Sequence, residues 1–257
     1  MSKILAFLLL IGASRLEAFV GKPRSFSLSR KMMAVTTNVL ELKNDLINLC
    51  TNVIVGEAVP EHVTKSIREC VEGIEAMSTQ TSLTQSLSNF DGEWLMLYST
   101  LPSFFKRIAL RDLSAGTIPS AEEVILVSRV KQIVKQKPTG EYSYDNLVEF
   151  SGSKADSTAQ PLPGFHVTRG TAVVNMPESA DNALRFDVAF YENEAYSPSS
   201  SKEDIDHFKQ LFGFKPEDSL LGKFPAAFKS WSDIVYLDET LRIMRGGKGN
   251  IYILQKK

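Results

Sequence analysis

The residues near the C-terminus restrict the fold of this chain more than any other segment. Residues 235–254 (VYLDETLRIMRGGKGNIYIL) hold three short apolar and aromatic runs, separated by Asp-Glu-Thr and Gly-Gly-Lys-Gly-Asn. The separators have the composition of turns, and the runs have the composition of strands. A meander with no helix after it predicts an antiparallel sheet or barrel. In barrels of this kind, function resides in the interior rather than in a catalytic loop.

The N-terminus has the pattern of a signal peptide, which we expect at residues 1–18. Lys3 precedes an apolar run at residues 4–13. This run is too short to span a bilayer but suits the core of a signal peptide. Ala18 supplies a small residue at the expected cleavage point, just before Phe19.

A transit-peptide-like segment is expected to follow at residues 19–34. No acidic residue occurs from position 19 to position 40, where basic residues are interspersed with serine. A basic, hydroxyl-rich and acid-free composition is typical of organelle transit peptides. The whole leader resembles the bipartite presequence with which diatom-like algae direct proteins into a complex plastid. The alternative is a secreted protein with a flexible basic arm.

Charge and cysteine content narrow the class of protein further. Residues 1–34 contain six basic residues and one acidic residue, so their removal takes the net charge from −1 to −6. An acidic chain of this kind argues against a broad nucleic-acid footprint. Cys50 and Cys70 are the only cysteines. Their spacing fits no zinc motif, and two thiols make no disulfide framework, so we expect both to pack as small apolar residues.

A helical hairpin and a connector are expected at residues 35–88. Two segments, at about 38–53 and 60–78, place apolar residues at helical spacing. Gly56 interrupts the pattern between them, and Pro60 suits the first turn of the second helix. The stripes predict that one face of each helix packs on a core. The polar stretch from Ser78 to Asn89 is expected to be a connector.

The rest of the chain, residues 89–257, is expected to form a mainly β, lipocalin-like antiparallel barrel of about eight strands. The C-terminal meander supplies three strands, and five others are predicted at 90–99, 123–134, 146–150, 165–176 and 184–191. A closed barrel of eight strands can hold one small ligand. Between the strands, Ser201 to Asp204 resembles a capping box that starts a short helix, with Gly213 as its end. The surrounding stretch, 208–231, is an aromatic insertion.

Several residues are candidates for contact with an apolar ligand inside this barrel. Ligand pockets are lined mainly by apolar and aromatic side chains with few polar ones. By strand alternation, the candidates share one face of a strand in each of two groups: Trp94, Met96 and Tyr98, and Phe186, Val188 and Phe190. Phe208 and Phe212 in the aromatic insertion could cap the open end as a lid. The alternative is a barrel filled by its own side chains.

Three segments carry a resemblance to a known family, the plastid lipid-associated proteins, also called fibrillins or plastoglobulins. They are Leu87 to Thr100 (LSNFDGEWLMLYST), Tyr144 to Phe150 (YDNLVEF) and Tyr236 to Gly246 (YLDETLRIMRG). The resemblance covers the chain from about residue 39 to its end and is weakest from 154 to 228. It implies a lipocalin-like barrel in a plastid, at thylakoids or plastoglobules. It also implies binding or carriage of apolar metabolites such as quinones, carotenoids or fatty acids.

The same resemblance directs attention to the C-terminal signature. In lipocalins, the tryptophan of a Gly-x-Trp strand opening closes one barrel end beneath an arginine from a late strand. A turn at Asp238 to Thr240 would place Tyr236 opposite Arg242, which makes Arg242 the first candidate to stack on an aromatic ring and a tentative ligand contact. Arg245 is the second candidate. For Asp238 we expect a turn role, in which its carboxylate accepts hydrogen bonds from backbone amides.

A loop after the first strand has the composition of a membrane-docking segment. Phe104 and Phe105 stand next to Lys106 and Arg107. Rings at such a place can enter a lipid surface while the cations meet headgroups. The alternative is that the rings pack under the loop and the cations are solvated.

Motifs for catalysis are missing from the sequence, and we expect no enzyme activity, no cofactor and no metal. There is no Gly-x-Ser-x-Gly, P-loop or Gly-x-Gly-x-x-Gly. The three histidines His62, His166 and His207 lie on separate elements without metal-ligand spacing, and are expected to be surface or hydrogen-bonded residues. Two other readings remain open besides the carrier: a structural coat protein of plastid lipid globules, and an enzyme acting on an apolar isoprenoid.

Overall fold

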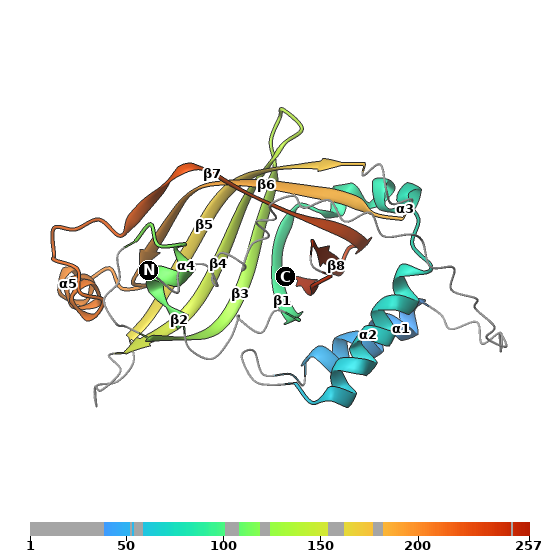
Figure 1. Cartoon of the computed structure of the whole chain (residues 1–257), viewed down its shortest axis with the longest axis horizontal. Coiled ribbons are helices and arrows are strands. Elements are labelled where there is room, and N and C mark those ends of the chain that lie inside the picture. The colour runs from blue at the N-terminus through green and yellow to red at the C-terminus, as the bar shows by residue number, and fades with distance from the viewer. Residues whose placement is uncertain are drawn as a thin grey trace, which may run out of the picture.

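Antiparallel strand pairing organises most of the chain in the computed structural model (Figure 1). The structure describes residues 39–51, 53, 59–100, 108–118, 124–153, 162–176, 182–247 and 249–257. The strands within these ranges are β1 (Gly92–Ser99), β2 (Ile108–Ala109), β3 (Val124–Gln136), β4 (Tyr142–Ser153), β5 (Leu162–Asn175), β6 (Leu184–Tyr196), β7 (Leu221–Leu237), β8 (Leu241–Gly246) and β9 (Ile251–Lys256).

Eight of these strands close into a barrel. Strands β3 to β9 pair in chain order, β9 pairs with β1, and β1 pairs back with β3 from Gly92↔Val134 to Leu95↔Lys131. The short β2 adds to β3 at Ile108↔Ile125. The closing pair joins Gly92–Leu95 of β1 to Lys131–Val134 of β3, so neither strand is an edge strand over these residues. The predicted antiparallel barrel of about eight strands is confirmed.

The helices lie at the ends and on one side of this barrel. They are α1 (Val39–Thr51), α2 (Glu61–Glu75), α3 (Gln80–Gln85), the 3-10 helix η3 (Ser86–Asn89), α4 (Leu110–Leu113) and α5 (Lys202–Leu211). Figure 1 shows α5 beyond one end of the barrel and α3 at the opposite end. None of the helices in the described ranges is long and apolar enough to cross a membrane.

The predicted helical hairpin packs on the outside of the barrel. Leu46, Ile67 and Val71 are fully buried. They share an apolar cluster with outward-facing residues of the last strands, including Ile243 and Ile253. Both cysteines belong to this interface and are free thiols, Cys50 buried and Cys70 partly buried. Burial and, next, the Cys70 thiol raise the pKa of Cys50 to about 12, so this residue acts as an apolar packing group.

Two segments differ from the sequence-based expectation. The connector before β1 forms α3, with Thr79 as its N-cap and a reciprocal capping box to Ser82, followed by η3. The aromatic insertion does not extend to position 231, because β7 already begins at Leu221. Pro225 falls within the stretch of β7 between Lys223 and Phe228 that is unpaired with β6. Proline has no backbone N–H group to donate to a strand ladder, which explains why the sequence did not predict a strand here.

Candidate functional site

The interior of the barrel holds two apolar clusters. The plug cluster lies at the α3 end and consists of Leu83, Phe90, Trp94, Val134, Tyr142, Tyr144, Ala172, Leu184, Phe186, Val188, Phe190, Ile234, Leu237, Met244 and Leu254. The lid cluster lies at the α5 end and consists of Met96, Leu110, Ile118, Val127, Val130, Val148, Phe150, Ala195, Phe208, Phe212, Phe214 and Leu220. The partly buried Tyr252 packs against both clusters.

The structure places most of the predicted ligand-contact residues in these clusters. Trp94, Phe186 and Phe190 belong to the plug cluster. Met96, Phe208 and Phe212 belong to the lid cluster. Side-chain alternation along β6 therefore points Phe186 and Phe190 inward, as the sequence pattern predicted.

Tyr98 departs from the prediction that it shares a strand face with Trp94 and Met96. Its side chain lies in the outer cluster with the helical hairpin. The cause is a β-bulge, since Met96 pairs with Leu254 while Tyr98 pairs with Ile253. One extra residue in a strand reverses the side on which later side chains lie. Tyr98 is thus a contact between barrel and hairpin and not part of the barrel interior.

Trp94 and Arg242 close the plug end of the barrel. The indole Nε1 of Trp94 donates to the backbone oxygen of Phe90 over 2.9 Å. The guanidinium carbon of Arg242 lies 4.7 Å from the Trp94 ring centroid and 4.9 Å from the Phe90 ring centroid. Each such contact contributes about 1–2 kcal/mol when the cation is desolvated. The predicted stacking of Arg242 on an aromatic ring is confirmed, with Trp94 and Phe90 as the rings.

The predicted pairing of Tyr236 with Arg242 is wrong by one residue. Tyr236 pairs with Ile243, and Arg242 pairs with Leu237. The turn is shorter than expected, because the amide of Asp238 donates to the oxygen of Leu241 over 3.0 Å. Arg245, the second stacking candidate, forms a two-pronged ion pair with Glu75 of α2, with one N···O distance of 2.6 Å. It fastens the hairpin to the barrel.

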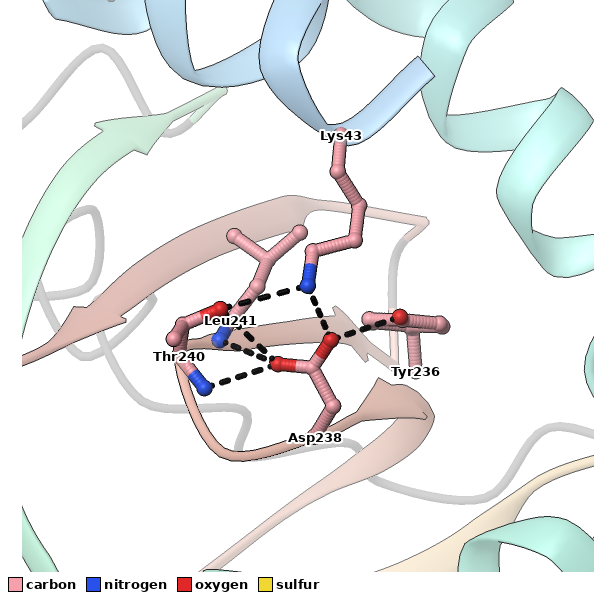
Figure 2. Close-up of polar contacts among 5 residues, drawn as sticks. All are labelled: Lys43, Tyr236, Asp238, Thr240 and Leu241. Carbon is pink, nitrogen blue, oxygen red and sulfur yellow. Dashed lines mark hydrogen bonds and ion pairs between the residues drawn. The ribbon is translucent and has the colours of Figure 1, made fainter. Parts of the chain in front are cut away.

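Asp238 holds the turn between β7 and β8, as predicted, and it also holds the helical hairpin (Figure 2). Its Oδ1 accepts from the amides of Thr240 at 2.7 Å and Leu241 at 2.8 Å. Its Oδ2 accepts from the Tyr236 hydroxyl at 2.7 Å and forms an ion pair with Lys43 of α1. Burial raises the pKa of Asp238, but the hydrogen bonds from Lys43, Thr240, Tyr236 and Leu241 outweigh it and lower the pKa to about 2. Sequence reasoning missed Lys43, because 195 residues separate it from Asp238.

Helix α5 covers the other end of the interior. Ser201 is its N-cap and accepts from the amide of Asp204, and Gly213 follows it with a φ of +76°, so both predicted boundaries are confirmed. The rings of Phe208 and Phe212 meet edge to face at 5.0 Å. Phe212 also meets the inward-facing Phe150 of β4 at 6.0 Å.

Two strand glycines make room for these rings, and sequence reasoning missed both. A Cβ atom at Gly152 of β4 would lie 2.3 Å from Cζ of Phe212. A Cβ atom at Gly164 of β5 would lie 2.7 Å from Cε2 of Phe208 and 2.6 Å from Cζ of Phe150. Neither glycine has a positive φ, so their role is close approach and not backbone freedom. Both glycines fall between the strands predicted at 146–150 and 165–176, in a stretch whose composition is that of a loop, so the sequence contains no signal of a strand position there.

The remaining predicted site residues lie elsewhere. The docking candidates Phe104, Phe105, Lys106 and Arg107 fall outside the described residues. Among the histidines, His62 and His207 are exposed. His166 instead is 1% exposed on β5, and its Nε2 has no hydrogen-bond partner, so the expected surface or hydrogen-bonded role does not fit that atom. Burial lowers the pKa of His166 to about 3, which keeps the imidazole neutral at physiological pH.

Comparison of the sequence with known proteins shows which proteins this chain is similar to. The PAP_fibrillin family model matches residues 40–255. A chromoplast-specific carotenoid-associated protein of Cucumis sativus is 21% identical over 86% of this chain and 69% of its own length. A chloroplastic plastid-lipid-associated protein of Citrus unshiu is 22% identical over the same shares. A light-induced chloroplastic protein of Solanum demissum is 23% identical over 74% of this chain and 59% of its own. No solved structure matches the chain.

Proposed function

The chain belongs to the PAP_fibrillin family, and from this premise we propose that it is a lipid-associated protein of plastids that carries one apolar molecule in its barrel. The observation that carries this proposal is the apolar interior, where Phe186, Phe190 and Phe150 face inward from β6 and β4. Aromatic and aliphatic walls are the usual lining of small-molecule sites. The names of the relatives, carotenoid-associated and plastid-lipid-associated, support the same class of ligand.

Helix α5 is the proposed lid of this site. It is inserted between β6 and β7 and contributes Phe208 and Phe212 to the interior, while its remaining described side chains are mostly polar and exposed. Such a helix can move away without opening the strand ladder, because no barrel hydrogen bond runs through it. Movement of this element would admit a lipid from a thylakoid or plastoglobule surface, and the segment with Phe104, Phe105, Lys106 and Arg107 is the proposed docking loop.

A fluorescence titration tests the carrier function. Trp94 lies inside the barrel. Trp231 of β7 instead stacks with Arg185, and the guanidinium carbon of Arg185 lies 3.7 Å from the centroid of the Trp231 ring. In a Trp231→Phe background, Trp94 alone reports on the interior. We expect saturable changes in its emission with at least one of plastoquinone analogues, carotenoids or fatty acids. If none of the three gives a saturable change, the coat-protein alternative replaces the carrier.

Plastid import is the second part of the proposal. It predicts that a fluorescent protein fused behind residues 1–40 enters the plastid of a diatom, with loss of about the first 34 residues. Replacing Phe19 with alanine in the same fusion should divert it, since this residue follows the expected signal-peptide cleavage point. Microscopy and mass spectrometry of the processed N-terminus give the result. Secretion of the unmodified fusion, or its retention in the endoplasmic reticulum, would contradict the proposal.

A further inference from the structure

Five buried polar atoms within the described ranges have no hydrogen-bond partner, and all of them belong to residues that face the barrel interior. They are Asn146 Oδ1, His166 Nε2, Asn193 Oδ1, and Nε and Nη1 of Arg242. An unpaired buried polar group costs about 1–3 kcal/mol, and more when the group is charged. Natural proteins keep few such atoms, and their concentration in one interior calls for a functional reason.

The strand register joins most of these residues into one polar track along the inner wall. Gln132 of β3 pairs with Asn146 of β4, Asn146 pairs with Thr168 of β5, and Thr168 pairs with Asn193 of β6. Directly paired residues hold their side chains about 5 Å apart. Arg242 joins the track at its first member, because its Nη2 donates to Oε1 of Gln132. The track therefore offers hydrogen-bonding groups within an otherwise apolar interior.

Arg242 is the one member of this track with a full charge, and nothing in the described part of the chain neutralises it. Its side chain is 0% exposed, and none of the ion pairs formed by the described residues includes it. Burial lowers the pKa of Arg242 to about 10, with Tyr144 opposing the shift, so the guanidinium stays charged at neutral pH. A buried charge without a counterion carries a desolvation penalty of several kcal/mol.

From this geometry we propose that the barrel interior is selective for apolar molecules that end in a carboxylate, and that this carboxylate accepts hydrogen bonds from the free N–H groups of Arg242. The inference rests on the proposed carrier function and names its class of ligand. A carboxylate supplies both the missing acceptors and the missing negative charge. A neutral ester, alcohol or hydrocarbon supplies no charge. The contacts of Arg242 with the rings of Phe90 and Trp94 hold the guanidinium in place before the ligand arrives, which lowers the entropy cost of binding.

The two ends of such a ligand match the two parts of the interior. The headgroup would lie by Arg242, Gln132 and Trp94. The apolar chain would extend past Tyr252, which packs against both clusters, toward Phe150 and the rings that α5 supplies. Polar atoms of Asn146 and Asn193 along the wall would suit a ligand with one further hydroxyl group.

The test compares palmitic acid, methyl palmitate and hexadecanol on the full chain with Trp231→Phe, using Trp94 emission. These probes share one chain length and differ in the charge of the end group. We expect palmitic acid to bind at least tenfold more tightly than the ester or the alcohol. Arg242→Gln should bring the affinity of the acid down to that of the ester. Arg245→Gln is the matched control on the same strand, because its side chain pairs with Glu75 on the outer face, and should keep the tenfold preference.

Each other outcome has a definite meaning. Equal affinity of all three probes for the unmodified Arg242 protein would overturn the carboxylate site but leave the carrier function standing. No saturable binding of any of these probes would also overturn the carboxylate site, and the titration with plastoquinone analogues and carotenoids would then decide the carrier function separately. If Arg242→Gln weakened acid and ester by the same factor, Arg242 would be structural and the inference would be wrong.

A second measurement needs no substitution, in case Arg242→Gln does not fold. NMR of palmitate labelled with carbon-13 at the carboxyl group, bound to the unmodified chain, follows the ionisation of the headgroup. A carboxylate beside a buried guanidinium should stay ionised about one pH unit or more below the pH at which palmitate titrates on vesicles. Titration at the same pH as on vesicles would contradict the inference.

Discussion

Replacing Asp238 with alanine is expected to lower the free energy of unfolding by about 2–4 kcal/mol. The substitution leaves the amides of Thr240 and Leu241 without their acceptor and the ammonium of Lys43 without its counterion. Hydrogen bonds to a charged group contribute about 1.5–3 kcal/mol, and breaking a partly buried ion pair adds to this. Urea unfolding at neutral pH measures the loss.

Glu239→Ala is the matched control, because it removes the same charge from the next position of the same turn. Glu239 is exposed, so we expect a change within about 0.5 kcal/mol. A loss for Asp238→Ala no larger than that of Glu239→Ala would show that the contacts in Figure 2 add little to stability.

The pH dependence of this difference follows from the lowered pKa of Asp238. The carboxyl has a pKa of about 2 in the folded chain, below its ordinary value of 3.8. The folded state therefore favours the ionised form, and the stabilisation is fully present above about pH 4. As the pH falls from about 4 through 2, the carboxylate becomes protonated and the advantage of the native chain over Asp238→Ala should shrink. A difference that stays constant across this range would contradict the assigned pKa.

The elements of the fold could be predicted because their signals are local. Apolar spacing gave both helices of the hairpin, and alternation gave the inward face of β6, since each pattern repeats within one element. The predicted strand was shorter than β7, because Pro225 interrupts the alternation of apolar and polar residues without ending the strand. The stretch around Pro225 is unpaired with β6. Tyr98 was placed on the wrong face for a related reason: a single bulge inverts the pattern, and no residue near it marks the bulge.

The site was less predictable because its contacts join distant parts of the chain. The stacking of Arg242 on Trp94 was expected from lipocalins, but its hydrogen bond to Gln132 spans 110 residues and depends on barrel closure. The polar track could not be read from the sequence either. Asn146 and Asn193 look like ordinary strand positions until the register sets them beside Gln132 and Thr168. The sequence shows the type of each residue but does not show which strands pair, and the polar track depends on that pairing.

Replacing Gly152 with valine is expected to release α5 from the barrel. The new Cβ would lie 2.3 Å from Cζ of Phe212, and the other two close atoms are in the same ring. Valine suits an extended backbone, and removal of glycine from the unfolded chain favours folding by about 0.4–1 kcal/mol. Overpacking of a buried site costs about 1–3 kcal/mol or more, so the cost of the clash exceeds the gain from removing glycine. We expect a net loss of about 1–2 kcal/mol, with cleavage of residues 197–220 by thermolysin accelerated at least tenfold.

Phe212→Ala provides the decisive background for this substitution. On its own, it removes a buried ring that is 1% exposed and should cost about 3–5 kcal/mol. In that background the obstacle to valine is gone, and its methyl groups occupy part of the space left by the ring. Gly152→Val is therefore expected to change sign, from destabilising in the native chain to stabilising beside Phe212→Ala, with a coupling energy above about 1 kcal/mol. Additive effects of the two substitutions would mean that Gly152 does not make room for the ring of Phe212. Ring packing would then not be what holds α5 on the barrel as a lid.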